Sequence, residues 1–141
     1  MAPKAKITTE GGATHGALSP FHATIRAWFT ETLGPPTVAQ ARAWPAIQNG
    51  DHVLLAAPTG SGKTLAAFLG CLDELARESG AQGEGQCQPL PAETRVLYLS
   101  PLRALGNDIQ KNLVGPLAEL RGRDPDFPEV EVLVRSGDTP A

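Results

Sequence analysis

Eight residues between a short apolar run and a long amphipathic stretch have the types and spacing to hold a phosphate group. They are Ala57, Pro58, Thr59, Gly60, Ser61, Gly62, Lys63 and Thr64. Gly60 and Gly62 allow backbone angles that other residues resist, so backbone N–H groups can approach phosphate oxygens. Lys63 can reach the outer phosphates of a nucleotide, and the Thr64 hydroxyl can coordinate Mg²⁺. The positive N-terminal end of the following helix attracts the same phosphates.

The loop follows the Walker A pattern G-x-x-x-x-G-K-[ST], except that Ala57 stands at its first position. It lies between an expected strand and an expected helix, which is the context that the pattern requires. A dinucleotide-binding G-x-G-x-x-G pattern fails, because Leu65 occupies the third glycine position. We therefore predict that residues 57–64 bind a nucleoside triphosphate, with Lys63 and Thr64 as catalytic contacts and Thr64 as the metal ligand. The pattern does not say what the bound nucleotide drives.

A glutamine upstream of this loop has the chemistry to read an adenine base. Gln40 closes the stretch Pro36-Thr37-Val38-Ala39-Gln40, in a short expected helix ahead of the loop. Its carboxamide carries a donor and an acceptor that match the N6/N7 edge of adenine. We predict that Gln40 contacts the base of the nucleotide. The alternative is a solvated helix glutamine.

Two further polar stretches follow expected strands at the same edge of the sheet. The first is Ser100, Pro101, Leu102 and Arg103, and the second is Gly137, Asp138 and Thr139. Ligands of open α/β sheets bind at the carboxyl ends of strands. A helix start opened by proline, together with Arg103, can offer N–H groups and charge to a nucleic-acid backbone. We predict that both stretches contact a nucleic-acid strand. The alternative for each stretch is an ordinary turn.

The order of apolar patterns predicts an α/β fold. Short apolar runs at 52–56, 95–100 and 130–134 are typical of buried strands. A helical pattern begins at Thr64, after the first run. A second helical pattern follows the run 95–100 and is interrupted near Gly115-Pro116. Strands that alternate with helices indicate βαβ units and a parallel sheet, here with about three strands.

Two helices are expected ahead of the first strand. Ser19 as N-cap and Pro20 at the first helical position begin the first helix. Thr37 precedes the second helix, which Pro45 should end or kink. Residues 1–18 lack periodicity, and we expect a mobile leader there.

Length, charge and cysteine usage exclude several classes. The chain has 141 residues and a net charge of −3, which allow one domain and show no strong basic patch. No apolar run approaches the ~18 residues of a membrane helix, and the first residues lack the apolar stretch of a secretory signal. Cys71 and Cys87 form no CxxC pair, which fits a reducing cytoplasm. The three histidines have no metal-ligand spacing.

Taken together and in this order, the motifs resemble superfamily 2 helicases of the DEAD/DEAH type. They are Pro-Thr-x-x-Gln at 36–40, Ala-Pro-Thr-Gly-Ser-Gly-Lys-Thr at 57–64, Ser-Pro-Leu-Arg-Ala-Leu at 100–105 and Gly-Asp-Thr at 137–139. The fuller wording at 43–45, 66–69, 97–105, 107–113 and 135–139 is similar to the large helicase-related (Lhr) family. Ligase-associated DEXH-box helicases are similar but less close. The resemblance covers about residues 20–141.

The resemblance implies a partial RecA-like P-loop NTPase domain that binds ATP, Mg²⁺ and single-stranded nucleic acid, with DNA favoured. It assigns Gln40 to the Q motif, residues 60–64 to motif I, residues 100–105 to motif Ia and residues 137–139 to the next strand-contacting loop. Enzymes of this kind couple ATP hydrolysis to 3′-to-5′ movement, and the Lhr family is linked to DNA repair.

Motif II, an Asp-Glu-x-His at the end of a later strand, is the feature of the family that this sequence lacks. Asp73-Glu74 lies within the helix after the phosphate loop, so we interpret it as a solvated helix face. We expect residues 19–141 to be the N-terminal part of the ATP-binding domain, unable to hydrolyse ATP without the rest of the helicase polypeptide. Two alternatives stay open: another P-loop NTPase such as a small kinase, and a non-catalytic module that binds nucleotide or single strands.

Overall fold

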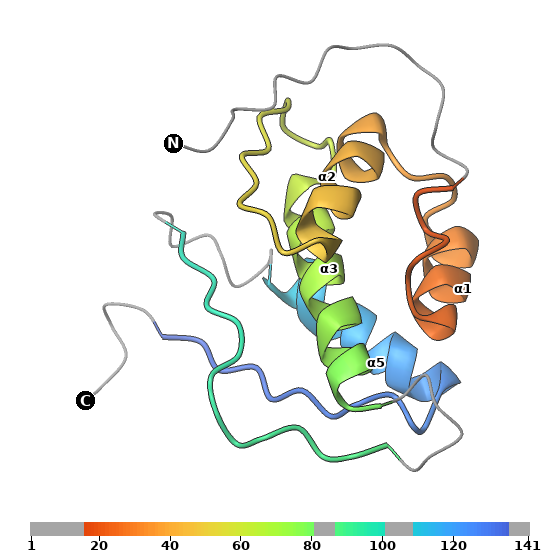
Figure 1. Ribbon diagram of the computed structural model, residues 1–141, viewed down its shortest axis with the longest axis vertical. Helices are drawn as coiled ribbons and strands as arrows, with labels where there is room; N and C mark the ends of the chain where they lie inside the picture. Colours follow the sequence, from red (N-terminus) through yellow and green to blue (C-terminus); the bar gives the residue numbers. More distant parts are fainter. Residues whose placement is uncertain (1–15, 81–86, 101–108, 136–141) are drawn as a thin grey trace.

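The computed structural model describes residues 16–80, 87–100 and 109–135 of the chain. Four α-helical or π-helical segments surround the central helix α3 (Figure 1). The elements are α1 (Ala23–Thr32), α2 (Val38–Gln48), α3 (Lys63–Glu78), the π-helix η1 (Gln110–Val114) and α5 (Gly115–Arg123). Within these ranges, no helix is both long enough and apolar enough to cross a membrane.

Helix α1 begins later than the sequence predicted. Ser19 and Pro20 belong to a turn, in which the Ser19 N–H donates to the Gly16 carbonyl at 3.0 Å. The N-cap is His22, whose Nδ1 accepts from the Thr24 N–H at 3.3 Å. The prediction of Ser19 as N-cap is wrong because backbone groups of this turn bond to α3 instead. The carbonyl of Pro20 accepts from the Arg77 side chain at 2.7 Å.

The expected leader ends earlier than predicted. Leu18 is only 7% exposed and packs in the main core cluster, so packed structure begins before residue 19. Residues 1–15 of that expected leader lie outside the described residues.

Helix α2 has a complete N-terminal cap and runs through its proline. The Thr37 hydroxyl accepts from the Gln40 N–H at 3.2 Å, and Gln40 Oε1 accepts from the Thr37 N–H at 2.9 Å. This reciprocal pair is a capping box, which satisfies two backbone N–H groups at the helix start. Pro45 neither ends the helix nor marks its boundary, since α2 continues to Gln48. The neighbouring Trp44 is fully buried, and its packing holds the last turn in place against the loss of one backbone bond.

The helix near Gly115-Pro116 is continuous rather than interrupted. The π-helix η1 leads directly into α5, and the Gly115 N–H donates to the Gln110 carbonyl across the join. Pro116 falls in the first turn of α5, at the change from π to α geometry. The π turn already departs from the regular i→i−4 ladder, so the missing N–H of Pro116 costs less at this join than it would inside a regular α-helix.

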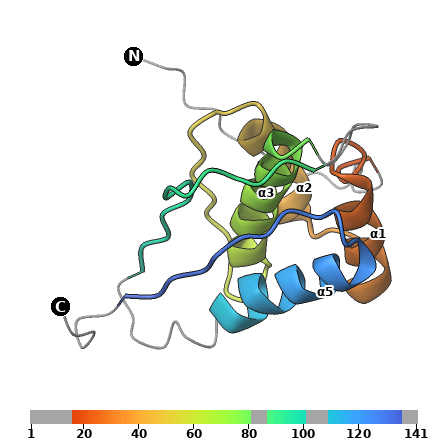
Figure 2. The same cartoon turned by 90° about the horizontal axis from the view of Figure 1, so that it is seen from below.

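A cluster of aromatic rings joins the N-terminal helices. Trp44 meets the edges of two rings, Phe21 at a centroid distance of 4.9 Å and Phe29 at 5.5 Å. Edge-to-face pairs of this kind add stabilisation beyond the area they bury. On the other side of α1, Trp28 Nε1 donates to a Glu119 carboxylate oxygen of α5 at 2.6 Å. The described core therefore lies among α1, α2, α3 and α5 (Figure 2).

The predicted strands at 52–56, 95–100 and 130–134 are not confirmed. These segments are described, and none of them has strand pairing (Figure 1). Large apolar side chains on them are exposed: Leu54 by 95%, Leu97 by 74%, Leu99 by 80% and Leu133 by 81%. A strand exists only where a neighbouring segment accepts and donates its backbone hydrogen bonds. These segments have the apolar pattern of strands, but no described part of the chain pairs with their backbone.

One side of these segments does contact the helices. The Tyr98 ring lies 4.9 Å from the Phe68 ring of α3. Val130 and Val132 pack against the main core cluster. The segments 95–100 and 130–134 therefore contact the helices on one side, while Leu97, Leu99 and Leu133 remain exposed.

Helices α2 and α3 approach closely at a glycine. Trp44 Nε1 donates to the Ala66 carbonyl at 3.1 Å. One turn further along α3, a Cβ atom added to Gly70 would lie 2.6 Å from Ile47 Cγ2. Gly70 is helical and buried, so its role is this approach and not an unusual backbone angle.

We predict that Gly70→Ala lowers the free energy of unfolding by about 1–3 kcal/mol, because the new methyl group forces α2 away from α3. Gly122→Ala is the matched control, since Gly122 is a helical glycine with nothing within 4 Å of the added Cβ. That control should leave stability unchanged or raise it by up to about 1 kcal/mol. Thermal unfolding followed by circular dichroism measures both. Equal stability of the two variants would contradict the close packing.

Candidate nucleotide-binding site

The phosphate loop ends at the first residue of α3. Gly60 and Gly62 have φ of 79° and 78°, in the left-handed region that favours glycine. Pro58, Thr59 and Gly60 are exposed, whereas the residues from Ser61 to Thr64 are half-buried. The loop is therefore open on one side and seated on the protein on the other. The N-terminal end of a helix of 16 residues lies directly under it.

Lys63 folds back over the loop. Its Nζ atom donates to the carbonyls of Ala57 and Pro58, each at 2.6 Å. The ammonium charge is thereby held above the backbone that leads into the helix. The predicted contact between Lys63 and nucleotide phosphates requires only that these two carbonyls give up the ammonium group.

Gln40 lies against the loop and is not a solvated helix residue. It is 3% exposed, which rules out that alternative. Its Nε2 donates to the Gly62 carbonyl at 3.4 Å, while its Oε1 belongs to the capping box of α2. A Cβ atom added to Gly62 would lie 2.4 Å from Gln40 Nε2. Gly62 is thus required both for its backbone angle and for the close approach of this glutamine.

Thr37 forms a second link between α2 and the loop, and sequence reasoning did not assign it this role. Its hydroxyl donates to the Ser61 carbonyl at 2.9 Å and accepts from the Gln40 N–H. The spacing Thr37-x-x-Gln40 is a capping-box signal that could have revealed the helix start. The contact with Ser61 depends on tertiary packing and has no sequence signal.

The described residues fit a nucleoside triphosphate. Ser61 Oγ is a buried hydroxyl with no hydrogen-bond partner among the described residues. A buried polar atom without a partner is costly, and a phosphate oxygen would satisfy it. Thr64 stands in the first turn of α3, where its hydroxyl could hold Mg²⁺. No group of three or more histidines, cysteines or acidic residues in the described ranges could hold a metal.

The predicted strand-contacting residues are largely outside the described part of the chain. Ser100 is described and exposed, and it follows the segment 95–100. The others are Pro101, Leu102, Arg103, Gly137, Asp138 and Thr139, which lie outside the described residues.

Asp73 overturns the prediction of a solvated Asp-Glu pair. Glu74 is exposed, but Asp73 is only 1% exposed and bonds to groups from two other elements. The sequence carried the signal, because the apolar residues Leu69 and Ala76 lie on the same helical face, four residues before and three residues after Asp73. The pair is still not a catalytic motif. Asp73 follows Lys63 by ten residues of helix, which is about 15 Å along the axis.

The comparison with protein families decides the class. The profile of the DEAD/DEAH box helicases matches residues 37–127. The chain belongs to the DEAD/DEAH box helicase family. The match begins at the Thr37 cap and includes Gln40 and the whole phosphate loop, which agrees with the resemblance seen in the sequence.

Several curated relatives are helicases of the Lhr type. The chain is 47% identical over 135 residues to the "Lhr helicase/ probable uracil glycosylase" of Mycolicibacterium smegmatis, covering 90% of this chain and 8% of that protein. It is 47% identical over 122 residues to the "ATP-dependent helicase Lhr-Core" of Sulfolobus acidocaldarius, covering 86% of this chain and 13% of that protein. The chain therefore spans only about a tenth of the length of these relatives.

A solved structure extends the likeness to the fold. It is the Mycobacterium smegmatis helicase Lhr bound to ssDNA and AMP-PNP, with a TM-score of 0.70 and 46% sequence identity. The alignment covers 88% of this chain and 15% of that one. Family and structural neighbour together imply a RecA-like α/β fold. This is an ATP-dependent helicase family, so the expected enzyme class is confirmed at that level.

We predict that Thr37→Val destabilises the protein by about 1–2 kcal/mol, because it removes the N-cap of α2 and its bond to the Ser61 carbonyl. Thr37→Ser keeps the hydroxyl and should stay close to the parent. Thr30→Val is the matched control, since the exposed Thr30 hydroxyl donates to the Arg26 carbonyl within α1. Urea unfolding measures all three. A Thr37→Val chain as stable as Thr30→Val would contradict the anchoring role.

Proposed function

We propose that residues 57–64 and Gln40 form the ATP-binding site of a helicase motor that moves on single-stranded DNA. The observation that carries this proposal is the joint contact of α2 with the loop. Thr37 bonds to the Ser61 carbonyl and Gln40 bonds to the Gly62 carbonyl. A carboxamide able to read adenine therefore stands beside a loop able to hold phosphates.

Each residue of the site has a distinct task in this proposal. Lys63 exchanges two backbone carbonyls for phosphate oxygens, and the ammonium charge compensates the negative charge of ATP. Ser61 Oγ gains the hydrogen-bond partner that it lacks among the described residues. Thr64 would hold Mg²⁺, which neutralises charge that develops during phosphoryl transfer. Gln40 turns its carboxamide from the Gly62 carbonyl toward the adenine edge.

The 141 residues are proposed to bind ATP without hydrolysing it. Phosphoryl transfer to water needs a carboxylate that orients the water and, in related motors, an arginine from a second domain. Asp73 is buried, and its place on α3 is about 15 Å from the loop. It cannot serve as that carboxylate. The chain spans about a tenth of the length of its relatives, and the remaining machinery is assigned to the rest of such a polypeptide.

We assign DNA binding to the two stretches that follow the expected strands 95–100 and 130–134. Ser100 to Arg103 and Gly137 to Thr139 are the proposed contacts, and the structural neighbour was bound to ssDNA. The segments 52–56, 95–100 and 130–134 are proposed to become strands of a parallel sheet once neighbouring backbone pairs with them. Their exposed leucines support this proposal, since a sheet covered on both faces is apolar on both faces. The residues from Leu18 onward then form the first part of that motor domain.

We predict that the purified chain binds a fluorescent ATP analogue in the presence of Mg²⁺ and that Lys63→Ala weakens binding at least about tenfold. A tenfold loss corresponds to about 1.4 kcal/mol, a modest value for a charged contact to phosphate. Gln40→Ala should reduce the preference for adenine over guanine nucleotides. Lys111→Ala and Gln110→Ala are matched controls on the exposed side of η1 and should bind like the parent. If Lys63→Ala and Lys111→Ala bound the ATP analogue equally well, the proposed site would be wrong.

We further predict no Mg²⁺-dependent phosphate release above the Lys63→Ala background, with or without single-stranded DNA. The physical reason is that we place none of the carboxylates in the described residues where it could activate the attacking water. A malachite-green assay on parent and Lys63→Ala chains measures this. Robust hydrolysis that Lys63→Ala abolishes would overturn the proposed incompetence, and transfer to an added acceptor would favour the small-kinase alternative.

A further inference from the structure

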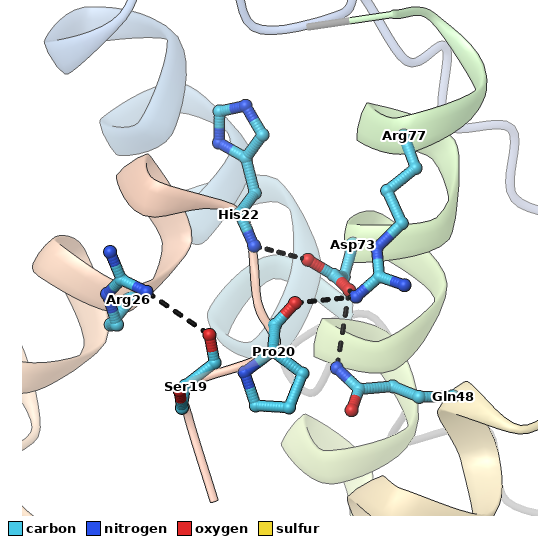
Figure 3. Close-up of polar contacts among 7 residues, drawn as sticks. All are labelled: Ser19, Pro20, His22, Arg26, Gln48, Asp73 and Arg77. Atoms are coloured by element: carbon cyan, nitrogen blue, oxygen red, sulfur yellow. Dashed lines mark hydrogen bonds and ion pairs between the residues drawn. The ribbon is translucent and has the colours of Figure 1, made fainter. Parts of the chain in front are cut away.

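Asp73 is the centre of a buried polar cluster that the proposed function does not use. Its Oδ1 accepts from the His22 backbone N–H at 2.6 Å (Figure 3). Its Oδ2 accepts from Gln48 Nε2 at 3.3 Å and forms an ion pair with Arg77 at 2.6 Å. A carboxylate that is 1% exposed is expensive to bury unless several donors compensate it. Here three donors do so.

The donors come from three different parts of the chain. His22 precedes α1, Gln48 is the last residue of α2, and Arg77 lies one turn along α3. Arg77 also donates to the Pro20 carbonyl, so the same pair holds the turn before α1 (Figure 3). Asp73 therefore joins the entry of α1 and the end of α2 to the helix that carries the phosphate loop.

Helix α2 is consequently attached to α3 at both ends. At its start, Thr37 and Gln40 bond to the carbonyls of Ser61 and Gly62. At its end, Gln48 bonds to Asp73. Gln40 and Gln48 are eight residues apart, which is about 12 Å of helix. Between these ends, Trp44 Nε1 bonds to the Ala66 carbonyl. A rigid helix that loses its Gln48 contact can tilt about this middle contact, and the tilt would move the Gln40 carboxamide relative to Gly62.

We propose that Asp73 is a positioning residue for nucleotide recognition: it holds the far end of α2 so that Gln40 stays beside the phosphate loop. It touches no nucleotide and acts through Gln48 and the register of α2 on α3. The proposal rests on the proposed role of residues 57–64 and Gln40 in ATP binding. A role in stability alone is the competing explanation.

The test compares Asp73→Asn with Glu74→Gln in the full 141-residue chain. Asparagine has nearly the shape of aspartate, but it removes the negative charge and one of the two acceptors. Glu74→Gln is the matched control because it removes the same charge from the exposed neighbour. The readouts are the dissociation constants of fluorescent ATP and GTP analogues and the melting temperature. Binding is measured well below that temperature, where every variant is folded.

We expect Asp73→Asn to weaken ATP binding about tenfold and to lower the ratio of ATP to GTP affinity, while Glu74→Gln changes neither by more than about twofold. The double variant Gln40→Ala with Asp73→Asn should show no further loss of the ratio, since both changes act on one contact. A melting temperature that falls with an unchanged affinity and ratio would overturn the proposal and leave a structural role.

A second variant and a second measurement keep the test decisive. If Asp73→Asn does not fold, Gln48→Ala removes only the α2 contact and should lower the same ratio. Hydrogen exchange of residues 38–48 needs no nucleotide, and Asp73→Asn should accelerate it relative to Glu74→Gln. If the parent chain fails to bind ATP, the proposed function fails while accelerated exchange still supports the positioning link. Unchanged exchange in that region would refute the link itself.

Discussion

The packing of α2 along α3 is the constraint on which the rest of the structure depends. The two helices are joined at three levels, through Thr37 and the Ser61 carbonyl, Trp44 and the Ala66 carbonyl, and Gln48 and Asp73. Every partner on α2 is thereby matched to one on α3 or on the loop before it. A change of register would break all three contacts together, which makes the arrangement specific as well as stable.

The phosphate loop owes its environment to this packing. A glycine-rich loop can adopt many shapes, because glycine has access to both signs of φ. Contacts to the carbonyls of Ser61 and Gly62 select one shape and seat one side of the loop on α2. The exposed side, with Lys63 held over it, remains accessible to a ligand. Preorganisation of this kind reduces the entropy lost on binding.

The segments outside the helical core differ from the helices in where their backbone hydrogen bonds must come from. Helices satisfy their backbone groups internally, so α1, α2, α3 and α5 can pack without further partners. The apolar segments at 52–56, 95–100 and 130–134 need backbone partners that the described residues do not provide, and their leucines stay in solvent. This division explains how the family-wide likeness to a RecA-like fold coexists with the missing strand pairing.

The sequence by itself determined the local features: the glycine-rich loop, the helix that follows it, the Thr37 start of α2 and the family. These features depend on residue type and short spacing, which the chain carries without reference to its fold. Only the tertiary structure decided the start of α1, the continuation of α2 past Pro45 and the burial of Asp73. Each of these involves partners distant in sequence, such as the His22 N–H on Asp73, 51 positions apart. Local helix propensity does not predict such contacts, because packing and hydrogen bonds between residues far apart in sequence outweigh it.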